Sequence, residues 1–154
     1  MLEFLKNIFP SNSVVKPEPY ESIYDSESIC RFIFSDKYYS ATKKTVKAGA
    51  FSPSSSGEAS ILRIDGLENE EIDRIDSEYI SGRRKDSKRS QGRADLKVAD
   101  IKTVSGGLFV SADIEGTHPR HANIKGYASE KSLLKQQTLE LANKSTLVLH
   151  KDLS

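Results

Sequence analysis

The alternation of apolar and polar positions first indicates a set of extended segments. Residues 29–35 are rich in β-branched and aromatic side chains and short enough for one strand. Residues 58–65 alternate in the same way, so every second side chain shares a face. The connection between them contains another extended stretch around residues 45–51, followed by a polar loop over residues 52–57. We therefore predict that the globular part begins with three strands.

A helical period replaces this alternation over residues 65–80. Apolar side chains recur there at helical spacing, acidic residues fill the first turn, and Asp65 and Glu68 fit a capping box. The following residues, 82–93, hold six basic side chains against one acidic side chain and include no apolar residue. That composition predicts a basic loop.

The second half of the chain alternates shorter elements. Residues 94–104 fit a short helix or a strand, and residues 106–114 fit a strand that is entered through a glycine pair. Residues 122–125 fit one more short strand, and residues 129–145 fit a helix that begins at a serine cap. This order predicts an α+β domain, a mostly antiparallel sheet with two main helices packed on one face.

The N-terminal segment differs from the rest. Residues 1–9 carry apolar side chains at helical spacing, Pro10 ends this helix, and a Pro- and Ser-rich stretch follows. We expect a short amphipathic helix and linker over residues 1–28, joined to a single α+β domain over residues 29–150 that includes the basic loop at 82–93. The helix either docks on a protein partner or caps the core of its own domain.

Composition narrows the class of protein. The 154 residues include 23 Lys and Arg against 22 Asp and Glu, so the net charge of +1 indicates no general preference for an acidic or a basic partner. Cys30 is the only cysteine, which excludes an intrachain disulfide, and its apolar neighbours predict a buried thiol. No apolar run approaches the ~20 residues of a membrane span, and the N-terminus lacks the flanks of a signal peptide. We expect a cytoplasmic protein without membrane contact.

Two of the three histidines, His118 and His121, lie on either side of a Pro-Arg pair. Pro119 excludes a mid-helix position for His118, and the simplest geometry makes Pro119 the first residue of a helical turn. Free backbone N–H groups of such a turn, with Arg120, would attract a phosphate or carboxylate. The pair could instead act as base and acid, or form a structural latch. A metal site is disfavoured, because no cysteine is available and the spacing is not helical.

Two arginines interrupt apolar alternation inside predicted strands. Arg31 and Arg63 each share a face with aliphatic side chains, and a buried arginine needs an anionic partner. An external anion is one possibility, and internal salt bridges are the other. If Arg31, Arg63 and the histidines point into one cavity, four distant segments form a cationic pocket. The internal carboxylates that could instead neutralise these arginines are Asp113, Glu58 and Asp95.

The basic loop raises a separate possibility. A flexible segment with six cations can contact nucleic-acid phosphates without reading sequence, although many charged loops are merely solvated. The cations are Arg83, Arg84, Lys85, Lys88, Arg89 and Arg93. No aromatic residue is interleaved among them, so the pattern does not indicate sequence-specific RNA binding. The chain also lacks a phosphate-binding P-loop, a GxGxxG fingerprint and a nucleophile elbow, and we expect no cofactor.

Four features between residues 29 and 145 occur together: an arginine in the first strand, a Phe-x-Pro turn, a Ser-hydrophobic-x-Arg strand, and a Pro-x-His-Ala segment before the last helix. In these features the chain resembles a group of small prokaryotic proteins of unassigned function. The resemblance implies that His121 matters more than His118 and that the two strand arginines belong to one site. The matching positions are Arg31, Phe51, Pro53, Ser60, Arg63, Pro119, His121 and Gly126.

Three hypotheses for function follow. The first is a small cytoplasmic module within a larger system, such as a defence cassette, which binds an anionic ligand (a nucleotide or a nucleic-acid phosphate) through Arg31, Arg63, Arg120 and His121. The second is a metal-independent phosphodiesterase or nuclease-type enzyme that uses His118 and His121. The third is a non-catalytic adaptor subunit that docks through residues 1–9.

Overall fold

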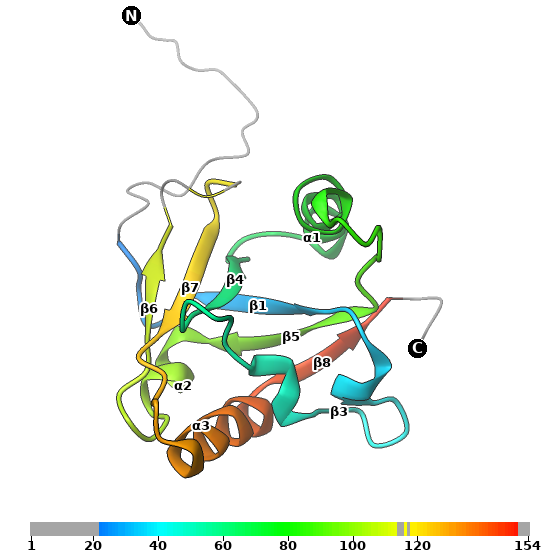
Figure 1. The fold of residues 1–154 in the computed structure, drawn as a ribbon. Coiled ribbons are helices and arrows are strands. Elements are labelled where there is room, and N and C mark those ends of the chain that lie inside the picture. The colour runs from blue at the N-terminus through cyan, green and yellow to red at the C-terminus, as the bar shows by residue number, and fades with distance from the viewer. Residues whose placement is uncertain (1–21, 114–115, 117, 151–154) are drawn as a thin grey trace, which may run out of the picture.

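The computed structural model describes residues 22–113, 116 and 118–150, which fold around a six-stranded antiparallel sheet with the order β6-β7-β4-β1-β5-β8 (Figure 1). The sheet strands are β1 (Ser28–Ile33), β4 (Ala59–Arg63), β5 (Gly92–Lys97), β6 (Phe109–Ala112), β7 (His121–Lys125) and β8 (Thr146–Leu149). A separate hairpin pairs β2 (Tyr39–Ser40) with β3 (Thr45–Val46). The predicted α+β class and antiparallel sheet are confirmed.

The helical elements are short except for the last. The α-helices are α1 (Asn69–Ile75), α2 (Val98–Lys102) and α3 (Lys131–Lys144). One π-helical turn, η4 (Asp76–Ile80), continues α1. Three 3₁₀ turns complete the set: η2 (Asp36–Tyr38), η3 (Ala48–Phe51) and η5 (Ser81–Arg83). No helix in the described ranges has the length and apolar character that crossing a bilayer requires.

The two main helices lie on opposite sides of the sheet (Figure 1), so the prediction that both pack on one face is wrong. Ile29 and Ile33 of β1 belong to the larger core together with Leu141 of α3, whereas Cys30 of β1 packs with Ile72 of α1. Successive strand residues point to opposite faces, and in β1 both faces are apolar. A central strand of this kind is covered from both sides.

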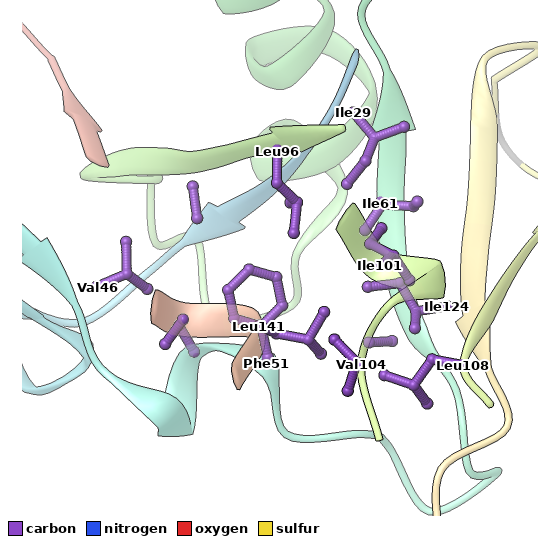
Figure 2. Close-up of a cluster of buried hydrophobic side chains, with 14 of the residues drawn as sticks. Ile29, Val46, Phe51, Ile61, Leu96, Ile101, Val104, Leu108, Ile124 and Leu141 are labelled. Carbon is purple, nitrogen blue, oxygen red and sulfur yellow. The ribbon is translucent and has the colours of Figure 1, made fainter. Parts of the chain in front are cut away.

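The larger core gathers around Phe51 of η3, which is fully buried (Figure 2). Leu141 of α3 and Ile101 of α2 belong to the same cluster, which also takes side chains from β1, β4, β5 and β7. A buried aromatic ring removes a large apolar area from water. Residues 45–51, predicted as an extended stretch, are therefore β3 followed by a buried 3₁₀ turn.

The smaller cluster lies between α1 and the other face of the sheet. Cys30 is fully buried in it, and burial raises the pKa of its thiol well above the ordinary value, so the prediction of a buried thiol is confirmed. The helix over this cluster begins at Asn69 rather than near residue 65. Glu68 and Glu71 form its capping box, while Asp65 accepts a hydrogen bond from the backbone N–H of Ser28.

Three boundaries differ from expectation. Residues 94–104 contain both the end of β5 and the whole of α2, and a last strand, β8, follows the final helix. At the other end, Glu27 is buried and Ile23 packs on the core, so the folded part begins before residue 29. The predicted amphipathic helix and docking segment at residues 1–9 lie outside the described residues.

Candidate functional site

The candidate site is a cavity that opens where two central strands separate. Strand β1 pairs with β4 only at Ile29–Arg63 and Cys30–Leu62. Beyond these pairs β1 continues along β5 as far as Ile33, and β4 continues along β7 as far as Ala59. The gap between the diverging strands leads into a cavity of about 470 Å³. Sequence patterns do not reveal this separation, because each strand remains regular on its other side.

Four segments form the walls of this cavity. Strands β1 and β4 supply the inner wall, the π-helical turn η4 and the start of the basic loop cover one side, and the segments flanking β6 and β7 close the far end. The wall residues are Arg31, Phe32, Phe34, Ser60, Ile61, Leu62, Tyr79, Ile80, Arg84, Asp113, Gly116 and His121. Aromatic and aliphatic surface therefore meets a small number of polar groups, as in many ligand sites.

Arg31 reaches across the gap between the strands. Its Nη1 donates to the carbonyl oxygen of Ser60 at 2.8 Å, and its Nε donates to the carbonyl oxygen of Ala50 at 3.0 Å. Within the part of the chain that the structure describes, no carboxylate pairs with Arg31, and burial lowers the pKa of its guanidinium. The wall thus holds a positive charge whose partners are neutral carbonyls.

His121 and Asp113 form a dyad at the far end of the cavity. Nδ1 of His121 lies 2.8 Å from Oδ2 of Asp113, and the histidine side chain is 15% exposed. Because the ionised carboxylate can only accept, Nδ1 carries the proton, and Nε2 on the opposite edge of the ring takes part in no hydrogen bond among the described residues. An oriented imidazole of this kind can accept a proton or bind an anion after protonation.

Gly116 makes room for this dyad. A Cβ atom at this position would lie 2.8 Å from Nδ1 of His121 and 2.9 Å from Oδ2 of Asp113. Both distances are too short for a carbon atom beside these polar atoms. The sequence pattern did not single out Gly116, and it indicated Asp113 only as a possible salt-bridge partner of an arginine. The local sequence carries no signal for either residue, because the pairing of β6 with β7 brings Asp113 to His121.

His118 lies outside the cavity wall and acts as a latch for the turn. Its Nδ1 accepts from the backbone N–H of Arg120 at 3.1 Å, and its carbonyl oxygen accepts from the backbone N–H of His121 at 2.9 Å. The ring packs edge-on against Tyr79, with 4.9 Å between centroids. Burial is the main cause that lowers the pKa of His118, and the positive charge of Arg120 lowers it further. The predicted helical turn at Pro119 is wrong: a tight turn leads directly into β7.

Arg63 and Arg120 are not in the cavity wall. Arg63 forms a bidentate ion pair with Glu27, with Nε–Oε1 at 2.8 Å and Nη2–Oε2 at 2.7 Å, and the two side chains are 4% and 8% exposed. His121 pairs with Leu62, the neighbour of Arg63, so His121 and Arg63 point to opposite faces. Arg120 donates from Nη1 to the backbone carbonyls of Arg63 and Asp65. The predicted cationic pocket of Arg31, Arg63 and the histidines is therefore wrong: of these residues, only Arg31 and His121 line the cavity.

The basic loop is more structured than expected. The guanidinium of Arg84 stacks on the ring of Phe34 at 3.9 Å and forms a bidentate pair with Asp86, whose pKa this hydrogen bonding lowers to about 2. The guanidinium of Arg83 lies 5.3 Å from the ring centroid of Tyr79. These cation–π contacts come from aromatic residues outside the loop, so the composition of the loop alone does not indicate them.

The other loop cations divide into two groups. Lys85, Lys88 and Arg89 are exposed. Arg93 lies instead in β5, where it is buried, donates from Nε to Asp95 at 2.9 Å and donates from Nη2 to Asn69 at 2.8 Å. Its assignment to a nucleic-acid-binding loop is therefore wrong, because its guanidinium holds the sheet to α1.

A second polar cluster supports the covering turn. Asp76 of η4 is 3% exposed, and its two oxygens accept from the hydroxyl of Ser81, at 2.7 Å, and from the hydroxyl of Ser90. Nε2 of His150, at the end of β8, lies 2.9 Å from the Ser90 hydroxyl. Nδ1 of His150 lies 3.8 Å from Oδ1 of Asp73. This cluster ties α1 and η4 to the residues that lie next to β5 and β8.

In the described ranges, no group of three or more His, Cys, Asp and Glu side chains could hold a metal ion. Comparisons of the chain with models of protein families, with curated proteins and with solved structures give no match. The function is therefore inferred from the geometry of the cavity.

Proposed function

We propose that the cavity between β1 and β4 binds a small anionic ligand with a flat apolar part, and that a nucleotide is the class that fits best. The main support for this proposal is the position of Arg31. Its charge lies in the cavity wall with two backbone carbonyls as partners and, among the described residues, no carboxylate. A partly desolvated cation attracts an anion more strongly than an exposed one does, so a phosphate group gains more here than at the surface.

The remaining walls suit the rest of a nucleotide. Phe32, Phe34 and Tyr79 offer aromatic surface on which a base can pack. His121 offers Nε2 as a hydrogen-bonding group at the polar end of the cavity. The volume of about 470 Å³ lies in the range of roughly 300–1,000 Å³ that is typical of small-molecule sites.

Calorimetric titration of the full chain with uridine and adenosine monophosphates, and with inorganic phosphate, tests the proposal. We expect the monophosphates to bind, and we expect Arg31→Gln to weaken them about tenfold or more, which corresponds to about 1.4 kcal/mol. Arg31→Lys keeps the charge and should retain part of the affinity. Lys102→Gln is the matched control, because Lys102 pairs with Asp25 at the surface and does not line the cavity.

Two results would overturn this proposal. One is a wild-type chain that binds none of the monophosphates at about 1 mM. The other is a folded Arg31→Gln chain, checked by circular dichroism, that binds them as tightly as wild type. If Arg31→Gln does not fold, His121→Gln and Phe34→Ala test the same cavity from its other walls, and unchanged affinity in both would overturn the proposal as well.

The dyad supports a second candidate, metal-independent hydrolysis of a phosphate ester. In this reaction Nε2 of His121 takes a proton from water, the resulting hydroxide forms a new bond to phosphorus, and the ester P–O bond breaks with departure of the leaving group. Asp113 orients the ring and stabilises the imidazolium that forms. His118 has no role in this version, because its Nδ1 already accepts a backbone hydrogen bond.

The p-nitrophenyl ester of thymidine 5′-phosphate is a suitable probe, because p-nitrophenolate leaves without needing a proton. We expect His121→Gln to abolish release of the phenolate, Asp113→Asn to lower it by about 10²–10⁴, and His118→Asn to retain it. Absence of turnover in the wild-type chain would rule out catalysis, and equal turnover in His121→Gln would rule out His121 as the general base; both results would leave the binding proposal intact.

A further inference from the structure

Arg84 belongs to the walls of two cavities. One is the cavity between β1 and β4, and the other, of about 260 Å³, lies between the π-helical turn and the basic loop. The second cavity is lined by Ser77, Ser81, Gly82, Arg84, Ser87 and Arg89. The hydroxyl of Ser81 already donates to Asp76, whereas the hydroxyls of Ser77 and Ser87 and the guanidinium of Arg89 can donate to phosphate oxygens. The two cavities are thus adjacent, and their chemistry differs: one combines aromatic and aliphatic surface with a few polar groups, and the other is polar and cationic.

The smaller cavity and the basic loop beside it have positive charge available for a ligand. The guanidinium of Arg89 makes only a long hydrogen bond, 3.4 Å, to the hydroxyl of Ser77, and no ion pair within the described part of the chain. Lys85 and Lys88 are exposed beside it. Asp86 is the one acidic residue of the loop, and Arg84 already takes up its two oxygens.

Two arginines at the junction lie against aromatic rings. Arg84 lies 3.9 Å from the ring centroid of Phe34 and Arg83 lies 5.3 Å from that of Tyr79, and both of these rings belong to the wall of the larger cavity. Surfaces that combine a ring and a guanidinium are the kind on which unstacked bases pack in proteins that bind single strands. If a base lies in this cavity, the neighbouring phosphates of its strand would therefore lie at the basic loop.

We propose that the protein binds single-stranded nucleic acid, with one base in the cavity between β1 and β4 and the neighbouring phosphates on the basic loop. This rests on the proposed function, because the base in the cavity is the nucleotide of that proposal. The strand is single because a paired base cannot leave its helix without unpairing. It runs over the loop rather than over α1, whose first turn carries Glu70 and Glu71 and repels phosphates.

Fluorescence anisotropy with a labelled ten-nucleotide dT or rU strand, over a range of salt concentrations, tests this. The strand should bind more tightly than the corresponding monophosphate. The logarithm of its binding constant should fall with the logarithm of salt concentration, by about 0.7 for each phosphate contacted. Lys88→Gln combined with Arg89→Gln removes two such contacts, so the slope should decrease by about 1.4 while the affinity for the monophosphate stays unchanged.

The matched control is Lys131→Gln combined with Lys135→Gln. These two lysines are exposed on α3, which packs on the opposite face of the sheet from η4. The control removes the same net charge, so it should leave both the slope and the affinity for the strand unchanged. An equal effect of the two double variants would mean that only overall charge matters, and it would overturn the proposal.

The outcomes also separate this inference from the proposed function. Monophosphate binding without a gain in affinity for the strand overturns the inference and leaves the small-molecule function standing. If neither the monophosphate nor the strand binds, both the inference and the proposed function are overturned. Equal binding of a duplex, or of an oligoglutamate peptide of similar charge, would also overturn it, because neither offers an unpaired base to the cavity.

Discussion

The buried carboxylate of Asp76 should be one of the costliest polar groups to remove. It is 3% exposed and accepts hydrogen bonds from the hydroxyls of Ser81 and Ser90. Through Ser90 it connects with His150 at the end of β8. The same π-helical turn carries Tyr79, which covers the cavity, so the carboxylate supports the fold and the site together.

The magnitude follows from these contacts. A hydrogen bond to a charged group contributes about 1.5–3 kcal/mol, and a buried hydroxyl left without its partner costs about 1–3 kcal/mol. Removing the buried carboxylate also removes its own desolvation cost, which offsets part of the loss. We therefore expect Asp76→Ala to lower the free energy of unfolding by about 3 kcal/mol, a large share of the roughly 5–15 kcal/mol of a typical domain.

Urea unfolding, followed by circular dichroism, measures this loss. A double-mutant cycle with Ser90→Ala isolates the contact between the two side chains, and we expect a coupling energy of about 1–2 kcal/mol. The matched control is Glu78→Ala, an exposed carboxylate on the same turn, which should change stability by no more than about 0.5 kcal/mol. A loss below about 1 kcal/mol for Asp76→Ala, or strict additivity in the cycle, would refute the reasoning.

Three further predictions concern single residues. Cys30 is fully buried with a raised pKa, so Ellman's reagent should label it only after unfolding; rapid labelling of the native protein would contradict its position. The lowered pKa of His118 means that the unfolded chain takes up this proton first, so stability should fall as pH drops below about 6.5, and His118→Asn should flatten that part of the urea-midpoint profile. Gly116→Ala should separate His121 from Asp113 and shift the imidazole NMR signals of His121, while the unfolding midpoint changes little; unshifted signals would show that the dyad tolerates a methyl group.

The sequence predicts the strands better than it predicts how they are covered. Residues 29–35 and 58–65 have the composition of strands, and β1 and β4 form there. The face of the sheet that each helix covers depends on which side of each strand is buried, and β1 is apolar on both sides. Two-sided burial of this kind leaves no polar face to indicate where solvent lies. The sequence pattern does not predict β8, because Thr146–Leu149 is short and follows a helix without a turn signal.

The candidate site shows the same limit for single residues. His118 and His121 are equally plausible from their spacing, yet one holds a turn and the other faces a cavity. The difference depends on Asp113, which the β6–β7 pairing brings to His121 through a backbone hydrogen bond between Asp113 N–H and the carbonyl of His121. That pairing is a property of the sheet, and the local sequence around the histidines does not contain it.

Arg31 and Arg63 give the same signal in the sequence, a cation inside an apolar strand, and their different outcomes follow from where strand pairing stops. Arg63 lies opposite Ile29, in the paired part of β1 and β4, and the segment before β1 brings Glu27 to its guanidinium. Arg31 lies two residues further along β1, where β4 has already turned away from it. Its side chain donates to the carbonyl oxygen of Ser60, a group that would lie within the sheet if the β1–β4 pairing continued. Its guanidinium therefore bridges a gap that the backbone leaves open, and the gap is also the cavity. A substitution at Arg31 should consequently affect ligand affinity and the separation of the two strands together, whereas a substitution at Arg63 should affect stability alone.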